Sequence, residues 1–254
     1  MTFLVIDTSG DYGVVALGEN DGSVKAVSVF EGRRTLSRRL LGVIDTLLKE
    51  NGLTLRALTG LAVGIGPGSF TGLRVGLTTM KTFAQVTGLP LVGVGTLDAY
   101  AYAVDATSVA VATPSRRGEV YVAIYAFDPP GSPFPGEERG WGRGVSTPIA
   151  ASTSDLAGRL LSIAGGLVLT GGPGALAEIL APQSLSAPIM GDQNVLGILR
   201  VPRPWTPPEG LARISAARLT AGEVDNPISL VPAYVVPPAI STPRDSSILP
   251  AAQP

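Results

Sequence analysis

The chain has 254 residues, a formal net charge of -1, and neither cysteine nor histidine. These absences exclude disulfides, thiolate nucleophiles, Cys- or His-based metal sites and His-dependent catalytic triads. The near-neutral charge argues against a surface that coats nucleic acid. No stretch approaches the ~18 or more apolar residues of a membrane span, and the N-terminus lacks the basic region of a signal peptide. We therefore expect a cytoplasmic protein without membrane contact.

In the first half of the chain, short apolar runs bounded by Gly- and Asp-rich turns predict strands. Two longer segments carry apolar residues at helical spacing. The strands are expected at 3–8, 12–17, 23–30, 61–65 and 91–94. The helices are expected at 36–50, which Asn51-Gly52 would end, and at about 71–87. The order β-β-β-α-β-α-β is typical of an α/β protein.

The second half repeats this pattern less clearly. Strands are expected at 109–113, 119–127 and 167–170, and helices at about 153–164, after the glycine run 171–174, and at 211–221. The stretch 128–148 is too rich in Gly and Pro for regular structure and is expected to form a long exposed loop. We predict two related subdomains, at 1–103 and 104–236, and a tail at 237–254 with a composition typical of disorder.

The glycine-rich stretch GIGPGSFTGLR, 64–74, lies between an expected strand and an expected helix. Its spacing matches neither the nucleotide P-loop nor the dinucleotide fingerprint. Gly66 and Gly68 allow sharp turning, and Ser69 or Thr71 could cap the helix beside N–H groups that attract anions. A tight turn that lets the helix and strand pack closely explains the pattern equally well.

Two further features have open interpretations. Basic residues cluster at Arg33, Arg34, Arg38 and Arg39, and again at Arg116 and Arg117. They indicate either a solvated helix face and a basic turn or a contact to tRNA or an acidic partner. The expected helices at 36–50 and 71–87 each have a wide apolar surface, which either intramolecular neighbours or a partner could cover.

Three motifs carry a family resemblance. IDTS follows the first strand, GPGSFTGLRVG follows the strand at 61–65, and LPLVGVGTL comes next. Together they resemble the bacterial TsaB family, also called YeaZ, whose members are partner proteins in making threonylcarbamoyladenosine (t6A) at position 37 of tRNA. RRTLSRRLLGVIDTLL, RRGEVYVAIY and LVPAYV support the resemblance, which is strong over 2–125 and weak over 150–236. The family motif loop comprises Gly66, Pro67, Gly68, Ser69, Phe70, Thr71, Gly72 and Arg74.

The resemblance implies an actin-like ASKHA (RNase H-like) fold with two related subdomains. It also implies a non-catalytic subunit, because the catalytic sibling TsaD holds a metal with two histidines and this chain has no histidine. The implied partners are a TsaD-type protein, TsaE and TsaC/TsaC2-type proteins of the same pathway, tRNA through the complex, and a second copy when alone. No cofactor of its own is implied, while ATP is used by the complex, near the partner interface or elsewhere.

In this family the two helices at 36–50 and 71–87 form a four-helix contact with TsaD or with a second copy. The resemblance therefore implies an interface that includes Leu36, Arg39, Leu40, Val43, Leu73, Leu77, Met80, Lys81 and Ala84.

The alternative is an active ATPase or small-molecule kinase of the same fold. Asp7, Thr8 and Ser9 stand where that fold places its first phosphate loop, and 171–174 loosely resembles its adenosine loop. A vestigial turn explains the first as well, and no second phosphate loop of Asp-Gly-Gly type is visible. A peptidase is disfavoured because Ser69 has neither a histidine nor an evident lysine base.

Overall fold

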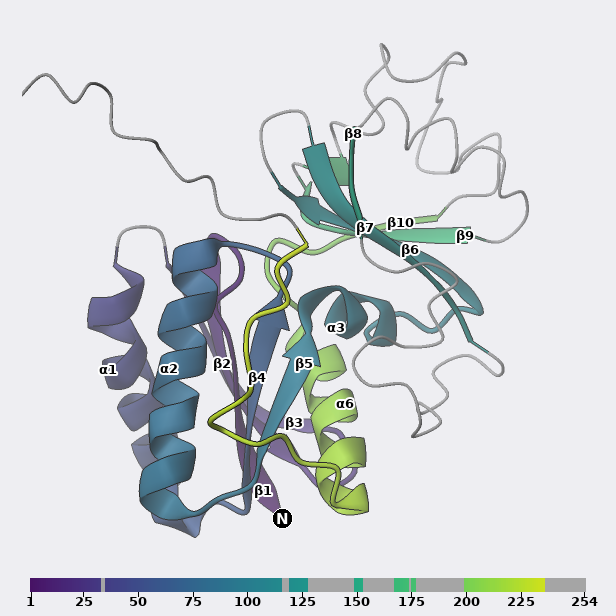
Figure 1. Ribbon diagram of the computed structural model, residues 1–254. Coiled ribbons are helices and arrows are strands. Elements are labelled where there is room, and N and C mark those ends of the chain that lie inside the picture. The colour runs from purple at the N-terminus through teal and green to yellow at the C-terminus, as the bar shows by residue number, and fades with distance from the viewer. Residues whose placement is uncertain are drawn as a thin grey trace, which may run out of the picture.

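The computed structural model describes residues 1–32, 35–115, 119–127, 149–152, 167–173, 175–176 and 199–235. Two five-stranded sheets lie at opposite ends of the molecule, and the short helix α3 (Thr96–Tyr102) contacts both (Figure 1). Within these residues, no helix combines the length and apolar character needed to cross a bilayer.

The first sheet has the strand order β3-β2-β1-β4-β5. Its strands are β1 (Thr2–Asp7), β2 (Tyr12–Glu19), β3 (Val24–Glu31), β4 (Gly60–Gly66) and β5 (Leu91–Gly95). β1, β2 and β3 pair antiparallel, whereas β4 and β5 continue the sheet in parallel. All five expected strands of the first half are therefore confirmed.

The second sheet repeats this topology in the order β10-β9-β6-β7-β8. Its strands are β6 (Ser108–Pro114), β7 (Glu119–Ala126), β8 (Ile149–Ser152), β9 (Leu167–Gly171) and β10 (Leu199–Pro202). Again three strands pair antiparallel and two follow in parallel. The expected relation between the two halves is confirmed, although β8 and β10 are too short to be recognised from periodicity.

Helices cover both faces of the first sheet (Figure 1). One face carries α1 (Leu36–Glu50) and α2 (Phe70–Thr87), both close to their expected bounds. A short 3-10 helix, η1 (Leu55–Ala57), precedes β4. The other face carries α3 and α6 (Pro208–Ala221), which begins earlier than expected because proline is tolerated in a first helical turn. α3 was not expected, since all seven of its residues are buried and no amphipathic period marks it.

The side chains of β1 show how the sheet serves two cores. Phe3 and Val5 face the core that includes α3, α6 and the second sheet, whereas Leu4 and Ile6 face the core under α1 and α2. This alternation follows from the two-residue period of a strand. Both faces are buried, which explains why β1 reads as a continuous apolar run ending at Asp7.

The segment 223–235, which we call the strap, returns from α6 along β5 and α2 (Figure 1). Asp225 N–H donates to the Leu91 carbonyl at 2.8 Å, and Ala233 N–H donates to the Ile65 carbonyl at 2.7 Å. α6 itself packs on the first sheet although it follows the second in sequence. The expected division near residue 103 stays a prediction, and the expected loop at 128–148, the helix at 153–164 and the tail at 237–254 lie outside the described residues.

Candidate functional site

Asp7 ends β1 at the position where the kinase alternative places a phosphate loop, and its side chain is fully buried. Its Oδ1 accepts hydrogen bonds from Ser9 N–H at 2.9 Å, Ser9 Oγ at 2.6 Å and Thr206 Oγ1 at 3.0 Å. Its Oδ2 accepts from Thr96 Oγ1 at 3.1 Å. All four donors are neutral. Ser9 lies two residues after Asp7, whereas Thr96 and Thr206 come from distant parts of the chain.

A carboxylate offers about four acceptor sites, and Asp7 accepts four hydrogen bonds, three on Oδ1 and one on Oδ2. A buried carboxylate is tolerated only when such hydrogen bonds replace its water. Thr96 begins α3 and Thr206 immediately precedes α6, so Asp7 connects the first sheet with the two helices on its other face. Asp7 therefore has a structural role, which we call its fastening role: its hydrogen bonds hold α3 and α6 against the first sheet. Its expected role in nucleotide binding stays a prediction.

Three glycines at intervals of four bring the start of α2 close to the end of β1: Gly68 and Gly72 in the motif loop, and Gly76 just after it. A Cβ added at Gly68 would overlap the Ser9 carbonyl, one at Gly72 the Thr8 carbonyl, and one at Gly76 the Thr8 hydroxyl. The start of α2 therefore packs backbone against backbone on the turn that follows β1. Glycine is required there because any side chain would separate the two segments.

Hydrogen bonds close the same junction. Ser69 N–H donates to the Ser9 carbonyl at 2.6 Å, and Thr8 Oγ1 donates to the Gly72 carbonyl at 2.8 Å. Ser69 is the N-cap of α2, because its Oγ accepts from Gly72 N–H at 3.2 Å. Of the interpretations left open, the structure supports close packing and capping by Ser69, whereas Thr71 is exposed.

The exposed end of the motif loop carries a small stack of side chains. The Arg74 guanidinium lies 4.3 Å from the centre of the Phe70 ring. That ring lies 5.3 Å from the ring of Tyr234 on the strap. The stack attaches the strap to the N-terminal end of α2.

A second buried carboxylate, Asp98 on α3, faces the second sheet. Tyr125 of β7 donates its hydroxyl to Asp98 Oδ1 at 2.7 Å. Burial, together with the charge of Asp98, raises the pKa of Tyr125 well above its ordinary value and also raises that of Tyr102. Burial and the charge of Asp7 likewise raise the pKa of Tyr100. All three tyrosines are therefore held in the neutral form.

The residues expected at a partner interface are divided by their burial. Five are at most 5% exposed: Leu40, Leu73, Leu77, Met80 and Ala84. They pack inside this chain, because the apolar side of each helix that they form covers the first sheet. This corrects their expected orientation toward a partner; binding through these helices stays a prediction.

The other four expected interface residues lie nearer the surface. Leu36 and Val43 are half-buried against the same core, and Arg39 is exposed. Lys81 holds the strap, since its Nζ donates to the carbonyls of Ile228 and Leu230, each at 3.0 Å. One apolar side chain of α1 faces solvent instead: Leu41 is 55% exposed.

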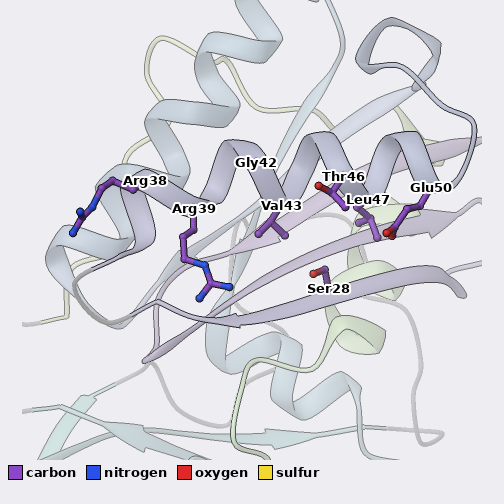
Figure 2. Close-up of a pocket in the computed structure, with 8 residues that line it drawn as sticks. All are labelled: Ser28, Arg38, Arg39, Gly42, Val43, Thr46, Leu47 and Glu50. Carbon is purple, nitrogen blue, oxygen red and sulfur yellow. The ribbon is translucent and has the colours of Figure 1, made fainter.

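A groove of about 280 Å³ runs between α1 and the edge strand β3 (Figure 2). We call it the α1–β3 groove; its walls are formed by Ser28, Arg38, Arg39, Gly42, Thr46 and Glu50. Val43 and Leu47 form its apolar part. Arg38 and Arg39 lie at one end of α1 and Glu50 at the other (Figure 2). Sequence reasoning noted the arginines but could not place them beside a strand.

The glycine run of the second half also has a packing explanation. Gly171 has a φ of 140°, and a Cβ there would overlap the backbone of Ala112 on β6. Gly172 N–H donates to the Ala112 carbonyl at 3.1 Å. The expected adenosine-loop role of this run stays a prediction. Among the described residues, no group of three or more His, Cys, Asp or Glu side chains is arranged to hold a metal.

Comparison with known proteins gives consistent matches. The family model of TsaD, tRNA N6-adenosine threonylcarbamoyltransferase, matches residues 31–128. The tRNA threonylcarbamoyladenosine biosynthesis protein TsaB of Escherichia coli is 40% identical over 133 residues, which cover 50% of this chain and 56% of that protein. TsaB of Bacillus subtilis is 32% identical over 130 residues, 50% of this chain and 56% of the relative. The chain spans about half the length of the curated relatives it matches.

Solved structures agree over a longer stretch. YeaZ from Pseudomonas aeruginosa aligns with a TM-score of 0.68 at 24% identity and covers 92% of this chain and 99% of its own. A second structure from that organism, described as similar to peptidase YEAZ, gives a TM-score of 0.70 with the same coverage. Two sheets of one topology with helices between and around them define an α/β protein of the actin-like ASKHA class. Within that class, the chain is similar to the TsaB (YeaZ) family over about half of its length.

Proposed function

We propose that this chain is an accessory subunit in the formation of t6A at position 37 of tRNA. It would bind and support a TsaD-type transferase without catalysing the transfer itself. Its similarity to TsaB proteins and the match of residues 31–128 to the TsaD model support the pathway. TsaE and TsaC/TsaC2-type proteins would act in the same pathway, and tRNA would be met through the complex.

The observation that carries the non-catalytic part is the set of four hydrogen bonds that the buried Asp7 carboxylate accepts within the chain. A kinase or ATPase of this fold needs carboxylate oxygens that are free to hold a metal-bound water or orient a nucleophile. Here Ser9 and Thr206 supply three donors to Oδ1, and Thr96 supplies one to Oδ2. Opening the site would strip a buried carboxylate of its hydrogen bonds, which opposes the ATPase alternative.

The proposed contact uses the outer side of α1 and α2. The buried rows of both helices already pack against the core of this chain, so a partner would contact exposed side chains such as Leu41. A homodimer through the same side would form when the chain is alone. ATP would be used by the complex, and this chain would hold no nucleotide of its own.

Reconstitution tests the proposal. Purified chain, the TsaD-, TsaE- and TsaC-type proteins of the same organism, tRNA, threonine, bicarbonate and ATP are combined, and t6A is measured by mass spectrometry of digested tRNA. We expect t6A only when both the chain and TsaD are present, and no ATP hydrolysis above background by the chain alone. ATP turnover by the isolated chain that disappears in Asp7→Ala would instead support the ATPase alternative.

A further inference from the structure

Gly42 has no structural explanation in the isolated chain. It lies inside α1, where glycine lowers helix stability relative to alanine. Its φ is not positive, and a Cβ added there would meet nothing within 4 Å. In this last respect it differs from Gly72 and Gly76 of α2, where an added Cβ would overlap Thr8 in the turn after β1. What Gly42 provides is room at the wall of the α1–β3 groove.

The basic end of the groove departs from helix preferences too. Arg38 and Arg39 lie in or next to the first turn of α1, which contains no acidic residue. Helix N-termini carry a partial positive charge and favour anions. Two cations at this end of α1 are therefore repelled by the helix dipole and by each other. The Arg38 side chain makes no hydrogen bond or ion pair with the described residues. The Arg39 guanidinium lies 5.3 Å from the centre of the Phe30 ring and donates a 3.5 Å hydrogen bond to the Glu31 carbonyl.

The opposite wall is a strand with a free edge. Among the described strands β3 pairs only with β2, so one side of its backbone has no sheet partner. Such an edge is a template for an added strand. Val27 on β3 is 47% exposed, and Ser28 lines the groove. An extended segment placed along this edge would lie beneath α1, against Val43 and Leu47.

We propose that the α1–β3 groove binds an extended, acidic segment of a partner protein, which adds a strand beside β3. Gly42 inside a helix and two arginines near its N-terminus both depart from ordinary helix preferences, and both lie at this groove. Such departures typically mark a functional site. A carboxylate of the segment would be bound by Arg38 and Arg39, and its aliphatic side chains would contact Val43 and Leu47. Glu50 would disfavour a second acid at the far end, which sets the direction of the segment. Gly42 would let its backbone approach α1 closely.

The test uses a fluorescein-labelled peptide of about six residues, a usual strand length, with alternating valine and glutamate. Its binding to the full chain is measured by fluorescence anisotropy, and the contacted amides are mapped by NMR. We expect saturable binding that weakens with salt and shifts concentrated in 24–31 and 36–50. A peptide with lysine in place of glutamate should bind at least about tenfold more weakly.

Variants assign the site. Gly42→Leu should fill the groove and weaken binding about tenfold, and Arg38→Ala and Arg39→Ala should each weaken it several-fold. Lys49→Ala, which removes an exposed cation of α1 outside the groove, should leave binding unchanged. The arginine variants decide the question if Gly42→Leu does not fold.

The proposal is overturned if the glutamate peptide does not bind, if the lysine peptide binds as tightly, or if the amide shifts lie away from β3 and α1. Unchanged binding by both arginine variants would overturn it as well. Because the assay contains no TsaD-type protein or tRNA, its failure would leave the proposed function in t6A formation untouched, and the reverse also holds.

Discussion

The side chain of Thr8, just after β1, is hydrogen-bonded to the backbone of Gly72, in the first turn of α2. Thr8 Oγ1 donates to the Gly72 carbonyl at 2.8 Å, while the Thr8 carbonyl occupies the space that a Cβ of Gly72 would need. The motif loop therefore seats α2 directly on the turn after β1. Its glycines serve this contact between two segments 64 positions apart.

Helical glycines of the two helices should respond oppositely to alanine. Gly76→Ala places a methyl group against the Thr8 hydroxyl, and overpacking of this kind costs about 1–3 kcal/mol of unfolding free energy. Gly42→Ala meets open space and should gain about 0.5–1 kcal/mol from helix propensity. Urea unfolding followed by circular dichroism measures both. Stabilisation by Gly76→Ala would contradict the close packing of α2 on the turn.

Asp7→Ala should lower stability rather than remove an activity. The substitution leaves buried neutral donors from Ser9, Thr96 and Thr206 without their acceptor, and each unsatisfied donor costs about 1–3 kcal/mol. Thr206→Val removes one donor and should cost less. Thermal unfolding measures the effect, and isothermal titration with ATP is the companion measurement. An Asp7→Ala chain that is as stable as wild type but has lost measurable ATP binding would contradict the fastening role.

Stability should fall in strongly alkaline solution. Burial and nearby carboxylates raise the pKa of Tyr100, Tyr102 and Tyr125 in the folded chain above the ordinary 10.0. Above that pH the unfolded chain loses protons that the folded chain keeps, so the unfolding free energy decreases by at most about 1.4 kcal/mol per pH unit for each tyrosine. Below it, these groups add no pH dependence.

Urea unfolding between about pH 8 and about pH 11 checks this expectation. Tyr125→Phe removes one titrating group and should make the decline shallower, while losing the hydrogen bond to Asp98 lowers stability at all pH values. A flat profile through the alkaline range would show that these tyrosines are not held neutral by the fold.

Much of the fold can be predicted from the sequence because its elements have clear periods. The expected bounds of α1 match the structure, and those of α2 differ by one residue, since Asn51 and Gly88 mark their ends. α3 could not be predicted, because a helix buried on all sides carries no amphipathic pattern. The strand order of the second sheet was likewise beyond reach from strands of four residues.

The candidate site was predicted only in part. The sequence places Asp7 at the end of a strand, but its donors Thr96 and Thr206 are distant in the chain. Thr96 belongs to the LPLVGVGTL motif, yet nothing in the sequence connects either threonine with Asp7. The apolar row through Leu77 and Met80 has the same spacing whether it faces a partner or the core, so periodicity could not decide between them. Gly42 stands out only once the space around its Cα is known.

Burial separates two charge substitutions on the proposed partner-binding helices. Leu77 is 5% exposed, so Leu77→Glu puts a charge into the core and should unfold the chain or cost several kcal/mol. Leu41 is 55% exposed, so Leu41→Glu should leave the fold intact and change unfolding free energy by less than about 0.5 kcal/mol. Circular dichroism and thermal unfolding compare the two. A stable, folded Leu77→Glu chain would contradict the packing of α2 against the first sheet.

The most direct measurement of the central claim is t6A formation in the reconstituted mixture, with wild-type chain, Leu41→Glu and the control Val224→Glu. Val224 is 50% exposed on the strap and lies outside the proposed contact. The account predicts t6A with wild type and Val224→Glu, and at least about tenfold less with folded Leu41→Glu, together with weaker co-sedimentation with the TsaD-type protein in analytical ultracentrifugation. Full t6A formation by the TsaD-, TsaE- and TsaC-type proteins without this chain would contradict the claim that it is a required accessory subunit.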